Sequence, residues 1–136
     1  LDMGVEDYLL TSTVNGILAQ RLVRRLDKAN AEPYVALPEV IAEFGLERFT
    51  QERPITLYKP VPTPNHPSGY YGRTTIMEFL VMSDPLRRLI MQHAGMGEIE
   101  EQARREGMRT MYEDGLAKSV QGVTTIEEVL RVTQES

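Results

Sequence analysis

The stretch that decides the fold is Ser68–Leu80, which reads SGYYGRTTIMEFL. Its second half alternates between two sets of side chains and is rich in branched and aromatic residues, a pattern typical of a β-strand with one buried face. We expect a strand over Thr74–Met82, with Ile76 and Leu80 on one face. A strand of this kind needs a partner from another part of the chain.

Arg73 follows Gly72 directly before this predicted strand. Glycine lets the backbone approach a neighbour closely, and a planar guanidinium binds an anion through two parallel hydrogen bonds. Two interpretations are open: Arg73 neutralises a carboxylate of this chain, or it holds an anion that functions with the protein. Residue chemistry alone favours the internal salt bridge.

A second alternating stretch, Gln20–Leu26, predicts the partner strand, and the spacing before it predicts a helix over residues 11–18. If the two strands pair, residues 27–68 form an insertion between them. Seven of the eight prolines fall in this insertion, so long regular elements are unexpected there. Inside it we expect a short helix over Pro38–Phe44 and a short strand over Ile55–Tyr58.

The last third of the chain has the periodicity and punctuation of helices. We expect a helix with Asp84 as its N-cap, Pro85 at its first position and His93 on its apolar stripe. Two further helices are expected to begin at Gly97 and Met108. Thr124 with Glu127 three positions later predicts a capping box for a last helix. The fold class is therefore mixed α/β and mostly helical, with one strand pair, an inserted subdomain and a C-terminal cluster of short helices.

Charge and composition exclude several classes of protein. The chain of 136 residues has 15 basic and 20 acidic residues, a net charge of -5, which disfavours binding to nucleic acid phosphates. One basic group, Arg21, Arg24, Arg25 and Lys28, is open to two interpretations, a solvated face or a phosphate-binding site. No apolar run approaches the ~20 residues of a membrane span.

The chain has no cysteine, which excludes disulfides and thiolate metal sites and is consistent with a reducing compartment such as the cytosol. It also has no Gly-x-x-x-x-Gly-Lys-Ser/Thr loop, so we expect no ATP hydrolysis by this chain alone. Its two histidines, His66 and His93, do not define a catalytic triad. Because it begins Leu1-Asp2-Met3, we expect it to be a piece of a longer protein.

Four blocks occur in a fixed order: MGVEDYLL, ILAQRLVRRL, GYYGRTTIMEFLV and GMRTMYEDGLAKSVQGVTTIEEVLRVT. In this order the chain closely resembles the C-terminal part of the type II secretion and type IV pilus assembly ATPases. The resemblance covers nearly the whole chain outside residues 35–54. It implies that residues 1–26 and 69–83 are the last helix and edge hairpin of a RecA-like motor domain, residues 27–68 an inserted subdomain, and residues 84–136 a C-terminal helical extension.

The resemblance also implies a cytoplasmic homo-hexamer, peripheral at the bacterial inner membrane through platform proteins, which couples ATP hydrolysis to pseudopilus or pilus assembly. ATP and Mg²⁺ would bind to the parent protein upstream of this chain, and the fragment itself would be non-catalytic. The rival hypothesis is a standalone protein-binding adaptor derived from such a motor. A phosphate-binding loop in the upstream reading frame would separate the two.

Members of this family usually carry two Cys-x-x-Cys pairs that bind one zinc ion beside the insertion. The resemblance places these positions at Asp27, Asn30, Pro62 and Asn65, so we expect no zinc and an insertion held by packing and hydrogen bonds. A substitute site built from Asp27, His66 and a glutamate such as Glu32 is the alternative.

The resemblance further implies a role for Arg73. The arginine of the Gly-Arg-Thr stretch resembles one that works at or near the nucleotide site between subunits. Arg73 is therefore the candidate nucleotide or subunit-interface residue, and no residue of this chain is expected to be catalytic.

Overall fold

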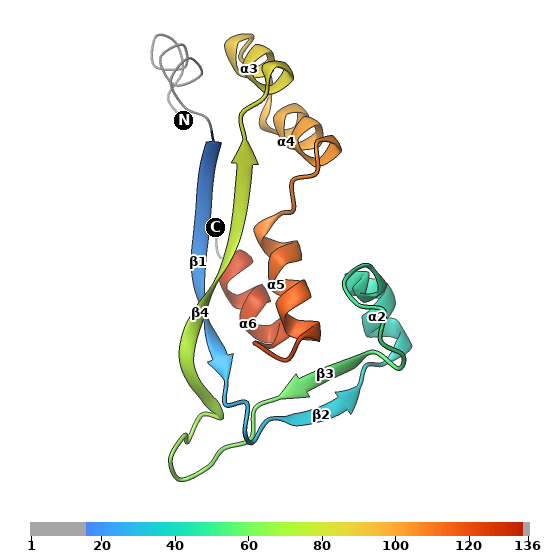
Figure 1. Cartoon of the computed structure of the whole chain (residues 1–136), viewed down its shortest axis with the longest axis vertical. Helices are drawn as coiled ribbons and strands as arrows, with labels where there is room; N and C mark the ends of the chain where they lie inside the picture. The colour runs from blue at the N-terminus through green and yellow to red at the C-terminus, as the bar shows by residue number, and fades with distance from the viewer. Residues whose placement is uncertain (1–15, 135–136) are drawn as a thin grey trace. The chain divides into compact units, whose positions relative to one another are not determined.

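The computed structural model describes residues 16–134, which form two compact units. One unit contains residues 16–19 and 78–110, and the other contains residues 20–77 and 111–134. Strands β1 (Gly16–Leu26) and β4 (Tyr70–Val81) run through both units and pair in a two-stranded sheet. Figure 1 shows that they run in opposite directions. The predicted strand pair is therefore confirmed, and we call it the ribbon.

Both strands are longer than the sequence predicts. Because β1 begins at Gly16, the predicted helix is wrong for residues 16–18, while residues 11–15 lie outside the described part. Gly16 weakens a helix, and pairing with β4 satisfies the backbone in the extended form. Since β4 begins at Tyr70, Arg73 lies inside the strand, after a glycine with φ of 75° that other residues rarely adopt.

The unit of residues 16–19 and 78–110 contains helices α3 (Asp84–Met91) and α4 (Met96–Arg105). The α3 N-cap is Ser83, whose hydroxyl accepts the Leu86 N–H at 3.3 Å, so the predicted Asp84 cap is wrong by one residue. His93, which the pattern places on the buried stripe of this helix, is instead exposed beyond its end. The core of the unit consists of Met82, Leu86, Ile90 and Ala103.

In the other unit, the insertion has its own small fold. Strand β2 (Glu32–Val35) pairs antiparallel with β3 (Thr56–Lys59), and between them lie α2 (Pro38–Phe44) and the 3₁₀ helix η1 (Leu46–Arg48). The predicted α2 is confirmed, and the predicted short strand is found one residue later as β3. Strand β2 was not predicted because it is only four exposed residues long and contains a proline, which an edge strand tolerates.

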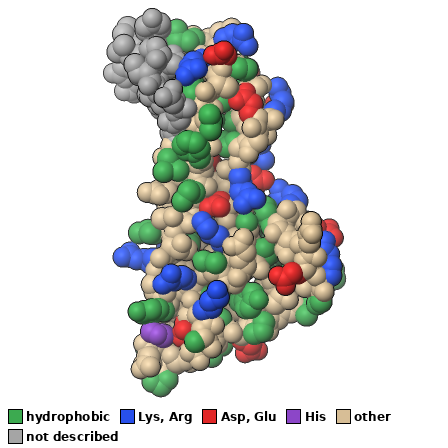
Figure 2. All heavy atoms as spheres, in the orientation of Figure 1, with side chains coloured by type: hydrophobic (Ala, Val, Ile, Leu, Met, Phe, Trp, Pro, Cys, Tyr) green, Lys and Arg blue, Asp and Glu red, His purple; other side chains and the backbone are tan. Residues whose placement is uncertain are grey.

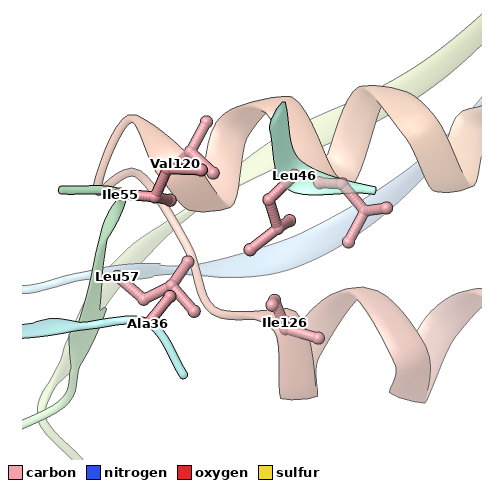
Figure 3. Close-up of a cluster of buried hydrophobic side chains, with 7 residues drawn as sticks. Ala36, Leu46, Ile55, Leu57, Val120 and Ile126 are labelled. Carbon is pink, nitrogen blue, oxygen red and sulfur yellow. The ribbon is translucent and has the colours of Figure 1, made fainter. Parts of the chain in front are cut away.

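Helices α5 (Met111–Val120) and α6 (Ile126–Thr133) form the middle layer of this unit. On one side, α6 packs on the ribbon in a cluster of Val23, Ile76, Val129 and Val132. On the other side, the helix pair packs on the insertion. Figure 3 shows this second cluster, which comprises Ala36, Leu46, Ile55, Leu57, Leu116, Val120 and Ile126.

The last helix begins one residue later than the capping box predicts. Thr125 is the N-cap of α6, and its hydroxyl accepts the N–H of Glu128 at 3.2 Å. Thr124 and Glu127 therefore do not cap the helix, and the side chain of Thr124 bonds to β1 instead. Within residues 16–134, no helix has the length and apolar character needed to cross a bilayer.

Candidate functional site

Arg73 is an exposed side chain on β4. Within the described part of the chain, no hydrogen bond or ion pair reaches its guanidinium. The internal salt bridge favoured by residue chemistry is therefore not made among residues 16–134.

Arg73 is one of several exposed cations on the ribbon. Arg21, Arg25 and Lys28 are also exposed, and none has an ion-pair partner among the described residues. The Arg25 Nε donates only to the Tyr71 carbonyl oxygen, at 3.4 Å. Figure 2 shows Lys and Arg side chains gathered over the lower part of the ribbon. We call Arg21, Arg25, Lys28 and Arg73 the cationic ribbon surface.

Arg24 differs from these four because it is paired with a buried carboxylate. The side chain of Glu128 is 2% exposed, and its oxygens accept the Arg24 backbone N–H at 2.8 Å, the Arg24 guanidinium at 2.9 Å and two Arg131 nitrogens at 3.0 Å. Burial raises the pKa of Glu128, but the hydrogen bonds from Arg131 and Arg24 outweigh it and lower the pKa from 4.5 to about 2. The carboxylate is therefore charged at neutral pH.

An aromatic ring completes this cluster. The Arg24 guanidinium lies 4.3 Å from the centre of the Tyr70 ring, a cation–π contact. The Tyr70 hydroxyl is 3.0 Å from the Thr125 hydroxyl, so a strand residue also reaches the helix cap. These contacts fix the end of the ribbon against α6.

The same contacts close the outer edge of β1 at its C-terminal end. Besides the Glu128 bond to the Arg24 N–H, the Thr124 hydroxyl donates to the Arg24 carbonyl at 2.8 Å. The Leu26 N–H donates to the Val123 carbonyl at 2.9 Å. Because these backbone groups are already bonded, no further strand can add here.

The edge of β4 is closed in a similar way by α5. The Asp114 carboxylate accepts the Met77 N–H at 2.9 Å, and the Lys118 ammonium donates to the Thr75 carbonyl at 2.6 Å. Asp114 and Lys118 also form an ion pair at 3.0 Å. Arg73 therefore lies on a strand held in place by two side chains of α5.

Asp27 and Asn30, where the resemblance places the first cysteine pair, are joined by a hydrogen bond. The Asn30 Nδ2 donates to the Asp27 carboxylate at 2.9 Å, and Asp27 is 7% exposed. The Asp27 carbonyl also accepts the N–H groups of Asn30 and Ala31, at 3.1 and 2.9 Å. Residues 27–31 thus form a turn closed by hydrogen bonds.

The second pair of positions, Pro62 and Asn65, lies on exposed chain beside a backbone-bonded turn. Thr63 and His66 exchange backbone hydrogen bonds at 3.0 and 3.1 Å. Over residues 16–134, no three His, Asp or Glu side chains come together to hold a metal, so the substitute site with His66 is not formed. Since the chain has no cysteine, the residues present do not fit a thiolate zinc site.

Comparison with known proteins gives the family. The model of the family described as "Type II/IV secretion system protein" matches residues 1–131. The chain belongs to the type II/IV secretion system protein family. This establishes the resemblance seen in the four sequence blocks.

Individual members of the type II/IV secretion family are similar over the whole chain. The type II secretion system protein E of Xanthomonas campestris pv. campestris is 67% identical over 100% of the chain and 24% of its own length. The type II secretion system ATPase E of Vibrio cholerae is 42% identical over 99% of the chain and 26% of its own length. The type IV pilus assembly ATPase PilB of Thermus thermophilus is 40% identical over 98% of the chain and 15% of its own length. The chain thus spans about a quarter or less of these relatives.

The sequence patterns singled out Arg73 but not the residues that hold the two strands, namely Asp114 and Lys118 on β4, and Thr124 and Glu128 on β1. One signal was present, because Thr125 with Glu128 is a second possible capping box one residue after the first. The carboxylate of Glu128 bonds to Arg24 and Arg131, so only the Thr125 half of that box is used as a cap.

Proposed function

We propose that this chain is the C-terminal part of a secretion motor ATPase that couples ATP hydrolysis to pseudopilus or pilus assembly. Support comes from its membership of the family and from its 67% identity to a protein named for the type II secretion system. The chain itself is non-catalytic, because it lacks a phosphate-binding loop. It completes the edge of the motor domain and forms contacts between subunits.

In this proposal the parent protein is a cytoplasmic homo-hexamer that docks on platform proteins of the inner membrane. ATP with Mg²⁺ is bound by the motor domain, and hydrolysis of its terminal phosphoanhydride bond drives the machine. The residues of this chain contribute rigid surfaces and charge at the subunit boundary. Its closed strand edges allow contact through side chains there rather than through strand addition.

Arg73 is the residue that we assign to the nucleotide or subunit boundary. The observation that carries this assignment is an exposed guanidinium with no partner in the described part of the chain, on a strand fixed by Asp114 and Lys118. A positioned guanidinium stabilises negative charge that develops on a transferring phosphoryl group, or anchors the contact that brings other groups there.

The test is ATP turnover by the full-length protein with Arg73→Ala or Arg73→Lys. We expect Arg73→Ala to lower turnover at least about tenfold, with partial recovery in Arg73→Lys. The temperature of unfolding should stay unchanged, because no hydrogen bond or ion pair reaches this guanidinium within residues 16–134. Arg88→Ala, at an exposed arginine of α3, is the control and keeps normal turnover. Normal turnover in Arg73→Ala would refute the assignment.

A further inference from the structure

We propose that the chain contacts a second copy of itself head to tail, with the cationic ribbon surface of one copy against an acidic surface on α2 of the next. This inference rests on the proposed role in subunit contacts and names the surfaces that make one of them. It is argued from the unit of residues 20–77 and 111–134, which contains both surfaces.

No side chain of the cationic ribbon surface forms an ion pair with a described residue of its own unit. Asp27, which lies between Arg25 and Lys28 in the sequence, is buried and bonds to Asn30, and Glu128 bonds to Arg24 and Arg131. The chain as a whole has a net charge of -5, so these unpaired positive charges are confined to one part of its surface. Like charges that gather without counter-ions repel one another, and an anionic partner relieves that repulsion.

A hollow in this surface is suited to a carboxylate side chain. It has a volume of about 460 Å³ and lies between the ribbon and the turn that joins α5 to α6. Arg25, Lys28 and Thr74 contribute two cations and a hydroxyl to its wall. The wall also contains the Asp27 carboxylate, which is buried and accepts a hydrogen bond from Asn30. A glutamate that enters it can accept hydrogen bonds from charged donors, which are stronger than those between neutral groups.

The acidic surface is on α2. Glu39 and Glu43 are both exposed, and their spacing of four residues places them on the same face of the helix. Helix α2 contains no basic residue, and neither carboxylate forms an ion pair within residues 16–134. Like charges at this spacing destabilise a helix by a few tenths of a kcal/mol, so a cationic partner is favourable here as well.

The two surfaces lie on different sides of the middle layer. Helices α5 and α6 separate the ribbon from α2, as the two hydrophobic clusters and Figure 1 show. A two-fold axis brings the same patch of both copies together, so one two-fold dimer cannot satisfy surfaces on opposite sides. Head-to-tail contact can, and it produces a ring when the rotation between copies closes.

A protein partner fits these observations better than nucleic acid. The net charge of -5 repels a polyanion and a second copy alike beyond the Debye length of about 10 Å at 0.1 M salt, but only the second copy also offers exposed cations to the acidic surface on α2. The acidic surface needed is present on the chain itself. A second copy is therefore the partner that the charges specify.

The experiment is sedimentation of the 136-residue chain over a range of concentrations at low and high NaCl. We expect association at low salt that weakens about tenfold or more at 1 M, where the Debye length is about 3 Å. Arg25→Glu with Lys28→Glu leaves two acidic surfaces on each copy, and Glu39→Lys with Glu43→Lys leaves two cationic ones. Each variant alone should be monomeric, and a mixture of the two should associate.

The quadruple variant, in which both surfaces are reversed, should associate again. Arg88→Glu with Arg105→Glu changes the net charge equally in the other unit and should associate like the parent chain. Circular dichroism checks that each variant is folded, and neutral Gln substitutions replace any that is not. A monomeric parent chain, or no association in the mixture and the quadruple variant, overturns the proposal. Arg73 is unchanged throughout, so failure here is separate from failure of the turnover test.

Discussion

Arg24 donates its backbone N–H and its guanidinium to the two carboxylate oxygens of Glu128, at 2.8 and 2.9 Å, although 104 residues separate them in the sequence. One buried side chain thereby joins the end of β1 to α6. Arg131 bonds to the same carboxylate from within the helix. The attachment of the ribbon to the helices depends on the charge of Glu128.

Glu128→Gln should therefore destabilise the chain in a pH-dependent way. The folded pKa of about 2 lies below the ordinary 4.5, so the charged form contributes stability that is complete above pH 4.5 and is lost as pH falls towards 2. We expect a loss of about 1–3 kcal/mol at pH 7, measured by urea unfolding. The difference between parent and variant should shrink between pH 4.5 and 2.

The neighbouring Glu127→Gln is the control for this measurement, because Glu127 is exposed and does not bond to Arg24 or Arg131. Its effect on the free energy of unfolding at pH 7 should be small. A Glu128→Gln variant whose loss of stability stayed constant from pH 7 to pH 2 would show that the ionised carboxylate is not what joins strand and helix.

Asn30→Ala should destabilise the turn that contains Asp27 and Asn30. The substitution leaves the nearly buried Asp27 carboxylate without its amide donor at 2.9 Å, which costs about 1–2 kcal/mol. Asn65→Ala, at the second pair, is the matched control because Asn65 is exposed and makes no side-chain hydrogen bond within the described residues. Equal unfolding midpoints for the two variants would argue against a structural role for the Asp27–Asn30 bond.

Sequence patterns predicted the elements whose ends are marked by neighbouring residues. They did not predict features that depend on contacts between residues far apart in the sequence. Pro38 and Gly45 mark the start and end of α2 in the sequence itself, and both are found there. Thr124 and Thr125 are each followed three positions later by a glutamate, so the sequence allows two caps. The bond from Thr124 to the Arg24 carbonyl decides between them, and it depends on a strand 100 residues away.

At the candidate site, too, local sequence identified a residue but not its long-range contacts. Sequence could single out Arg73, but with 20 acidic residues in the chain it could not tell which carboxylates were already engaged. The structure supplies that information, since Glu128 and Asp114 are committed to β1 and β4. Proximity across the fold, rather than residue type, separates the paired cations from the unpaired ones.

Lys118→Met should weaken the closed edge of β4. The ammonium donates to the Thr75 carbonyl at 2.6 Å and pairs with Asp114 at 3.0 Å, and the side chain is only 24% exposed. A methionine keeps the length of the side chain but not the donor, so we expect a loss of about 1–3 kcal/mol in urea unfolding. Lys59→Met removes an exposed pair with Glu32 and should cost less than about 1 kcal/mol. Similar losses in both variants would contradict a special role for Lys118.

The contact between α5 and α6 depends on the absence of a side chain at Gly115. A Cβ added there would lie 2.6 and 2.7 Å from the two Cγ atoms of Val129, which is fully buried. Gly115→Ala should therefore destabilise the chain by about 1–3 kcal/mol, although alanine favours a helix. The second substitution Val129→Ala should cost less in the Gly115→Ala background than in the parent, because it removes the clashing atoms. Gly97→Ala in α4, where no atom lies within 4 Å, should be neutral or stabilising, and strict additivity of the 115 and 129 changes would refute the close approach.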